Sequence, residues 1–155
     1  MPRSISTDQF SSKKFRPHGR AEHEVRDKLL WARAVGPFNR ELMAAVLEMA
    51  KITFPVMTAK GDWANICTFS ESALCSLDVL ADLADALGQM VQAGFAPKVM
   101  AFVLPADVEG SLLMAPLYEK ALREVGVPFK CFTEVEAAYG WVESFVGPLN
   151  GTQDN

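Results

Sequence analysis

The spacing of hydrophobic and polar positions changes along the chain, and each change marks a predicted element. Residues 63–69 and 98–104 are short, nearly continuous apolar runs, which predict strands buried on both faces of a parallel sheet. From residue 77 to residue 91, apolar side chains recur at helical spacing while acidic and amide side chains fill the opposite face. We therefore expect residues 63–91 to form the strand–turn–helix unit around which the chain is organised.

The segment before this unit predicts a hairpin followed by a helix. Two extended stretches, residues 23–26 and 29–35, flank the two turn residues Asp27 and Lys28. In the second stretch Trp31, Arg33 and Val35 should share one face, with Leu30, Ala32 and Ala34 on the other. Asn39 is a suitable N-cap for the helix, which we expect to end near Phe54 because Pro55 disfavours a helical residue before it.

The segment after the unit predicts two more helices and a last strand. We expect a third helix at residues 111–125 with a kink near Pro116, then a strand at residues 129–132. Residues 133–136 read as a capping box for a fourth helix. The order β-β-α-β-α-β-α-β-α predicts an α/β fold with a five-stranded, mostly parallel sheet, one antiparallel edge strand and four covering helices.

Length and composition fit one domain. The chain has 155 residues, of which 50% are hydrophobic, and this excludes a disordered protein. We expect a basic tail at residues 1–20, one domain at residues 21–147 and a polar tail at residues 148–155. Residues 1–20 lack the apolar stretch of a signal peptide, and Cys67, Cys75 and Cys131 contain no CxxC motif, which favours reduced thiols in a cytoplasmic protein.

Charge is unevenly distributed between the tail and the body. The tail carries five basic residues and only Asp8, so ten basic and eighteen acidic residues of the total of 15 and 19 remain for the rest. A basic tail is compatible with peripheral contact to anionic lipid, or with contact to the acidic body of its own chain. No nucleic-acid partner is expected, because the body lacks a basic stripe with interleaved aromatic residues.

Catalytic and metal-binding patterns are missing from the sequence. His18 and His23 are the only histidines, and both lie near the N-terminus, so a Ser-His or Cys-His nucleophile pair would require the tail to fold across the body. No metal-ligand spacing and no glycine-rich phosphate loop is found, and the acidic positions 78, 82 and 85 fit a solvated helix face. We therefore expect a protein that is not an enzyme, with no catalytic residues, metal or cofactor.

Two segments resemble a known family. Residues 34–39 (AVGPFN), followed by a helix and a buried strand that begins at Trp63, resemble the SpoIIAA-like branch of the STAS/CRAL-TRIO superfamily. Residues 127–132 and the Ala-rich, Trp-containing segment 136–142 are similar to the last strand and helix of that family. The resemblance implies a small cytoplasmic bacterial domain, wound as a β-α superhelix, that acts as a phosphorylation-switched regulator or holds apolar or lipid ligands.

The phosphorylation motif of the family is incomplete here. Anti-sigma-factor antagonists present Asp-Ser-(Ser/Ala)-Gly at the start of the second major helix, and the first Ser is phosphorylated. Residues 74–77 read Leu-Cys-Ser-Leu instead, so Ser76 is the nearest match by position and Ser72 is a second candidate phosphoacceptor. A phosphorylation switch is therefore the alternative hypothesis, and a binding module is the first.

A ligand site is expected where the parallel strands end. In an open α/β sheet, ligands gather at the carboxyl ends of strands, which here are residues 36–39, 70–76 and 105–111. This rim would bind a small apolar or lipid-like ligand, or a protein partner, between helices 77–91 and 111–125. The oligomeric state is left open, with a homodimer as one alternative. The rim residues expected to contact a ligand are Phe38, Asn39, Ser70, Ser72, Leu74, Ser76 and Leu112.

Overall fold

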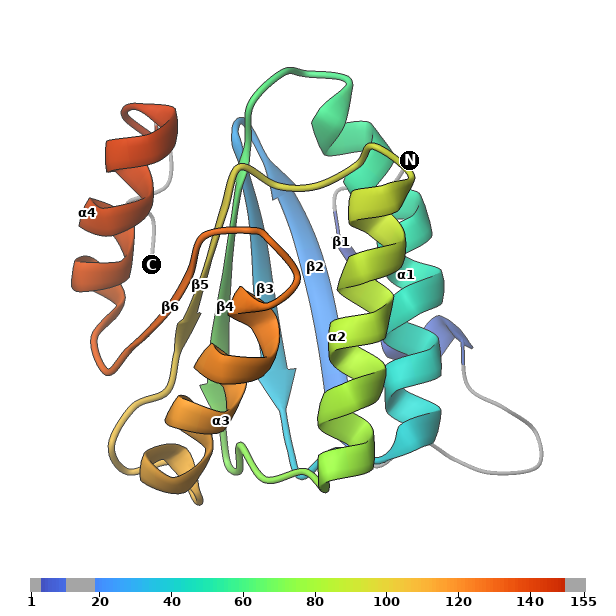
Figure 1. Cartoon of the computed structure of the whole chain (residues 1–155), viewed down its shortest axis with the longest axis vertical. Coiled ribbons are helices and arrows are strands. Elements are labelled where there is room, and N and C mark those ends of the chain that lie inside the picture. Colours follow the sequence, from blue (N-terminus) through green and yellow to red (C-terminus); the bar gives the residue numbers. More distant parts are fainter. Residues whose placement is uncertain (1–3, 11–18, 150–155) are drawn as a thin grey trace.

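A computed structural model describes residues 4–10 and 19–149, which form an α/β fold around one mixed sheet (Figure 1). The six strands lie in the sheet in chain order, β1 and β2 antiparallel to their neighbours and β3 to β6 mutually parallel. The strands are β1 Ser4–Ser6, β2 Arg20–Arg26, β3 Leu29–Val35, β4 Ala64–Ser70, β5 Val99–Val103 and β6 Phe129–Phe132. The helices are the 3₁₀-helix Thr7–Phe10 and the α-helices α1 Arg40–Thr58, α2 Leu77–Gln92, α3 Ser111–Arg123 and α4 Val135–Val146.

Helices cover both faces of the sheet, and each face has its own core. Figure 1 shows α1, α2 and α3 on one face and α4 on the other. Because β3 to β6 are neighbours in chain order, each connecting helix lies on the same face as the one before it. The larger core joins these three helices to the sheet, and the smaller core joins α4 to β4 and β5. Helix α1 lies over β2 and β3, and α2 packs beside α1.

The hairpin and the two buried strands agree with the expectation from sequence. Asp27 and Lys28 connect β2 to β3, and residues 64–70 and 99–103 are strands in the interior of the sheet. Along β3 the side chains alternate as expected, with Ala32 and Ala34 buried and Arg33 exposed. The helix over residues 77–92 is also confirmed, and Ser76 caps its first turn.

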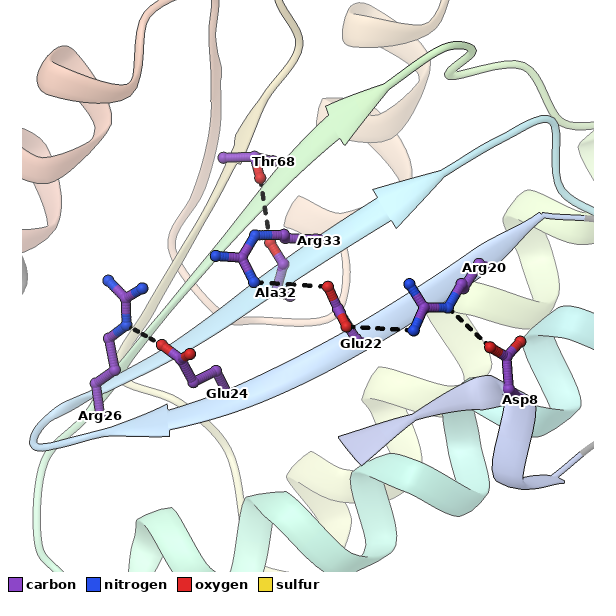
Figure 2. Close-up of polar contacts among 8 residues, drawn as sticks. All are labelled: Asp8, Arg20, Glu22, Glu24, Arg26, Ala32, Arg33 and Thr68. Carbon is purple, nitrogen blue, oxygen red and sulfur yellow. Dashed lines mark hydrogen bonds and ion pairs between the residues drawn. The ribbon is translucent and has the colours of Figure 1, made fainter. Parts of the chain in front are cut away.

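Charged side chains occupy the sheet face that α4 leaves open. Figure 2 shows them on β2, β3 and the 3₁₀-helix, with Thr68 Oγ1 donating to Ala32 O at 3.4 Å nearby. The ion pairs of this face are Arg20–Asp8 at 2.9 Å, Arg20–Glu22 and Arg33–Glu22 both at 3.5 Å, and Arg26–Glu24. Exposed pairs such as Arg20–Asp8 contribute little stability each.

The sheet has one strand more than the five expected. Residues 4–10, assigned to a tail from sequence, form β1 and the 3₁₀-helix, so two strands rather than one are antiparallel. The physical reason is a small apolar contact: Ile5 is buried and packs with Ala21 and Met49, and Phe10 lies against them. The other basic residues of the predicted tail, Arg3, Lys13, Lys14 and Arg16, lie outside the described residues, as do residues 150–155.

Two helix ends also differ from the expectation. Helix α1 continues past Pro55 to Thr58, because Phe54 and Met57 on its last turns are buried in the core. Helix α4 begins at Val135 with Glu134 as its N-cap and no side-chain capping bond. The capping box fails because it requires Thr133 as the N-cap, and the helix starts one residue later.

We predict that the first strand is part of the folded domain. The substitution Ile5→Ala should lower the free energy of unfolding by about 2 kcal/mol, because it empties a buried site between β2 and α1. Ile52→Ala is the matched control, since Ile52 is 38% exposed on α1 and should change stability by less than about 0.5 kcal/mol. Urea unfolding of both variants checks this, and equal stabilities would show that β1 is not docked.

Candidate functional site

The structure brings the three predicted rim loops together. Phe38 N donates to Leu74 O at 3.0 Å, and Ala73 N donates to Glu109 O at 2.8 Å. The approach is close: a Cβ on Gly36 would lie 2.1 Å from Ser72 O. Three loops far apart in sequence therefore form one continuous edge, as expected for the carboxyl ends of parallel strands.

The polar side chains of this rim are used within the rim itself. Asn39 Oδ1 accepts from Leu42 N at 2.9 Å and caps α1, and Ser76 Oγ accepts from Val79 N at 3.2 Å and caps α2. Ser72 is 3% exposed, and its Oγ accepts from Leu74 N at 3.2 Å. These oxygens satisfy helix and turn N–H groups, so they do not converge on a shared pocket.

The remaining rim residues divide between surface and core. Ser70 is exposed, and Leu112 is 80% exposed. Leu74 is half-buried, and its side chain fills the space beside Gly110. Phe38 is buried and is the one residue of the predicted ligand-binding set that lines the interior cavity described next.

An apolar cavity of about 100 Å³ lies between α1, α2 and the sheet. Its position differs from the expected one, which was between α2 and α3. The floor comes from β2 to β5, the roof comes from α1 and α2, and α3 contributes Tyr118. The lining residues are Ala21, His23, Ala32, Ala34, Phe38, Leu42, Met43, Val46, Ala50, Phe54, Asn65, Cys67, Phe69, Cys75, Val79, Leu83, Ala86, Leu87, Met90, Met100, Phe102 and Tyr118.

Small side chains in the middle of the floor create this cavity. Ala32 and Ala34 project from β3 toward the helices, and Ala21 projects from the neighbouring strand β2. Large aromatic residues stand at the ends: Phe54 contacts Trp63 with ring centroids 4.9 Å apart, and Phe38 contacts Phe69 at 5.8 Å. These rings hold α1 and α2 away from the alanines, so the space between them is not closed by collapse.

His23 places one polar group in the cavity floor. It is 7% exposed, and Nδ1 lies 2.9 Å from Thr53 Oγ1. Thr53 Oγ1 also lies 3.2 Å from Met49 O, which can only accept, so both contacts are hydrogen bonds in the tautomer in which Nδ1 carries the proton and donates to Thr53. Burial lowers the pKa of His23 to about 4, which keeps the ring neutral at pH 7.

The other polar groups in the cavity are neutral as well. Asn65 Nδ2 donates to Leu30 O at 2.9 Å, and Tyr118 OH donates to Ala73 O at 2.7 Å. Burial raises the pKa of the Cys67 thiol to about 12 and also raises the pKa of Cys75, whose Sγ lies 3.6 Å from Tyr118 OH. The cavity is therefore uncharged at neutral pH.

A surface groove between α1 and α2 lies over the cavity. It has a volume of about 230 Å³ and shares Met43 and Ala86 with the cavity lining. Arg40 bridges the two helices at this groove, with Nε 2.8 Å and Nη2 3.0 Å from the carboxylate oxygens of Asp82. Met43 lines both the groove and the cavity, so its side chain separates the two spaces. This side chain is flexible and can change its conformation at little cost.

Comparison of the chain with models of known protein families, with curated proteins and with solved structures finds no match. Within residues 4–10 and 19–149, no helix has the length and apolar character that a membrane crossing requires. The same part of the chain contains no group of three or more His, Cys, Asp or Glu residues placed to hold a metal ion.

The sequence contained a signal for this cavity that motif reasoning passed over. In the sequence alone, His23 is one of two histidines near the N-terminus. Its place in the cavity follows only from the register of the hairpin. In that register His23 pairs with Ala32, and Ala32 pairs with Cys67 on the next strand. A row of small or polar side chains on the inner face of three adjacent strands indicates a space under the helices.

We predict that His23 makes stability depend on pH. The folded-state pKa of about 4 lies below the ordinary value of 6.5, so the unfolded chain takes up a proton that the folded chain does not. The stabilisation is present above about pH 6.5 and is lost as the pH falls toward 4, a change of roughly 3 kcal/mol. Urea unfolding should therefore show that wild type loses roughly 3 kcal/mol more than His23→Phe between pH 7 and pH 4. Parallel stability curves for the two proteins would contradict the buried neutral histidine.

Proposed function

We propose that this protein is a non-catalytic binding module that holds a small apolar ligand in the cavity between α1, α2 and the sheet. The observation that carries the proposal is a cavity of about 100 Å³ with a nearly continuous apolar lining. Natural cores are close-packed, and an empty apolar space of this size is costly because its lining lacks contact atoms. An apolar ligand restores those contacts.

The size of the cavity restricts the ligand to a small molecule. An engineered apolar cavity of about 150 Å³ stays dry and binds benzene. A space of about 100 Å³ needs only a modest movement of its lining to accept a ring or a short chain. Met43, Met90 and Met100 supply that adjustment, because the unbranched thioether side chain changes shape at little cost. Access from the surface is expected through the groove beside Met43.

The proposed absence of catalysis rests on the chemistry of the buried groups. A cysteine nucleophile requires a thiolate, and the pKa values of Cys67 and Cys131 are both raised to about 12 by burial. A histidine base normally requires a partner that stabilises its charged form, and His23 instead contacts the neutral Thr53 hydroxyl. Both features suit binding better than proton or group transfer.

The family proposed from sequence is the SpoIIAA-like group, and with it a cytoplasmic bacterial protein. Its support is the run of neighbouring parallel strands β3 to β6, with α1, α2 and α3 on one face of the sheet. This is the winding that the resemblance implied. Three free cysteines support a reducing location. A protein partner at the rim remains the second kind of ligand compatible with a module of this type.

The test of this function is ligand-induced stabilisation by benzene or toluene. At ten times its Kd, a ligand stabilises the folded state by about 1.4 kcal/mol, which should raise Tm by about 3–6 °C. Ala32→Val should abolish this rise, because its two added carbons project from the middle of the floor into the cavity. The variant itself should be as stable as wild type or up to ~1.5 kcal/mol more stable.

Thr68→Val is the matched control. Thr68 lies on the adjacent strand with its side chain toward the opposite face, so the control places a β-branched apolar residue outside the cavity. The control should keep the full Tm response to toluene. An unchanged Tm in both wild type and control would overturn the proposed function, and an equal response in Ala32→Val would place the ligand elsewhere.

A phosphorylation switch is the alternative function. One observation favours Ser76, which is exposed and is the N-cap of α2, where an added phosphate would face the positive end of the helix. Ser72 is a poorer acceptor, because it is buried and its oxygen is held by Leu74 N. Intact-mass measurement after incubation with cell extract and ATP separates the two functions, and we expect no stoichiometric phosphate.

A further inference from the structure

The geometry points to a ligand of one chemical class, a neutral, ring-sized aromatic molecule that donates a hydrogen bond to Nε2 of His23, as a phenol does. This inference rests on the proposed function, because it names the ligand of the same cavity. It follows from three separate features: the tautomer of His23, the uncharged lining and the aromatic walls.

The contacts of Thr53 assign a tautomer to His23, which lines the cavity. In the tautomer that makes both Thr53 contacts hydrogen bonds, Nδ1 is protonated and Nε2 carries a lone pair. Among the described residues Nε2 has no hydrogen-bond partner, although the side chain is 7% exposed and lines the cavity. A donor on the ligand would give this acceptor a partner inside the cavity, so a ligand with a donor would be preferred.

Asn65 supplies a second acceptor in the same lining. Its Nδ2 must face Leu30 O, which can only accept, and this fixes the orientation of the amide. Oδ1 then has no partner among the described residues. Among the described residues that line the cavity, His23 Nε2 and Asn65 Oδ1 are two lone-pair atoms to which no hydrogen bond is found, and both complement a hydroxyl or N–H group.

The lining excludes charged ligands. Within residues 4–10 and 19–149, no Asp, Glu, Lys or Arg side chain lines the cavity, so a carboxylate or an ammonium group would be buried there without a counter-charge from these residues. The donor must therefore be neutral. A fatty acid at neutral pH does not meet this condition, whereas the hydroxyl of a phenol or the N–H of an indole does.

Aromatic residues surround the space that the ligand ring would occupy. Phe69 contacts Phe102 and Tyr118 with ring centroids 5.0 Å and 5.6 Å apart, and the His23 ring lies parallel to Phe54 at 6.4 Å. A flat ring can stack on or meet the edges of these side chains, and such aromatic pairs gain stability beyond their buried area. An aliphatic chain of equal size lacks this gain.

The experiment compares phenol and toluene in wild type and in His23→Phe. Kd values come from titrations followed by ¹H–¹⁵N NMR shifts of residues around the cavity. The hydration that phenol loses is the same for both proteins, so it cancels in the ratio of toluene Kd to phenol Kd. This ratio should fall about tenfold from wild type to His23→Phe, because the variant removes the Nε2 acceptor and phenol loses its hydrogen bond to that atom.

Thr53→Val is the second variant and keeps the test valid if His23→Phe does not fold. Valine has the shape of threonine but cannot accept from Nδ1, so the His23 tautomer is no longer fixed. The phenol preference should weaken while the toluene Kd stays unchanged. Anisole, which has the same oxygen without a proton, should bind both variants and wild type with no dependence on the acceptor.

The outcomes separate the inference from the function on which it rests. One outcome is that toluene binds in the cavity while His23→Phe leaves the ratio of toluene Kd to phenol Kd unchanged. That result would overturn the donor inference and keep the apolar binding function. No binding of either ligand would overturn both. Co-purification of a long-chain lipid in place of a ring-sized ligand would also contradict the inference.

Discussion

The separation between the helix pair α1–α2 and the sheet depends on one steric constraint. Strand β3 lies inside the sheet, and the side chains it directs toward the helices include Ala32 and Ala34. At both ends of the pair, aromatic contacts such as Phe54–Trp63 set the height at which the helices rest. Helices are rigid over this length, so α1 and α2 pass over the small side chains of Ala32 and Ala34 without bending toward them. The cavity, its neutral histidine and the proposed ligand all follow from this arrangement.

A histidine in such a space is stable only in its neutral form. Desolvation lowers its pKa to about 4, and Thr53 fixes which nitrogen carries the proton. In the proposed account, His23 Nε2 is thus an oriented acceptor in a mostly apolar environment, where a hydrogen bond is stronger than in water. An acceptor without a partner costs stability in the empty cavity, and the same acceptor gives selectivity for a ligand with a donor.

Local patterns were sufficient to predict most of the fold. The apolar runs of β4 and β5 and the helical spacing of α2 are signals within one segment, and each was found with its position correct to one or two residues. Strand β1 has only three residues and owes its stability to pairing with β2 and to the burial of Ile5, neither of which a local pattern contains.

The rim was located correctly as an edge where loops meet. Two of its polar residues, Asn39 and Ser76, are helix caps, because Ser and Asn serve helix N-termini and ligand sites equally well. The cavity depends on which side chains meet across β2, β3 and β4, and therefore on strand register.

The most direct test of the account is a crystal structure of the protein under xenon pressure. Xenon binds in empty apolar cavities and needs no hydrogen-bond partner, so it reports the space itself. The account predicts a xenon atom in the cavity between the sheet and the helices α1 and α2. It should lie over Ala32 and Ala34, with the side chains of His23 and Phe54 beside it. A structure in which the helices contact these alanines directly, with no xenon between them, would contradict the cavity and every functional conclusion drawn from it.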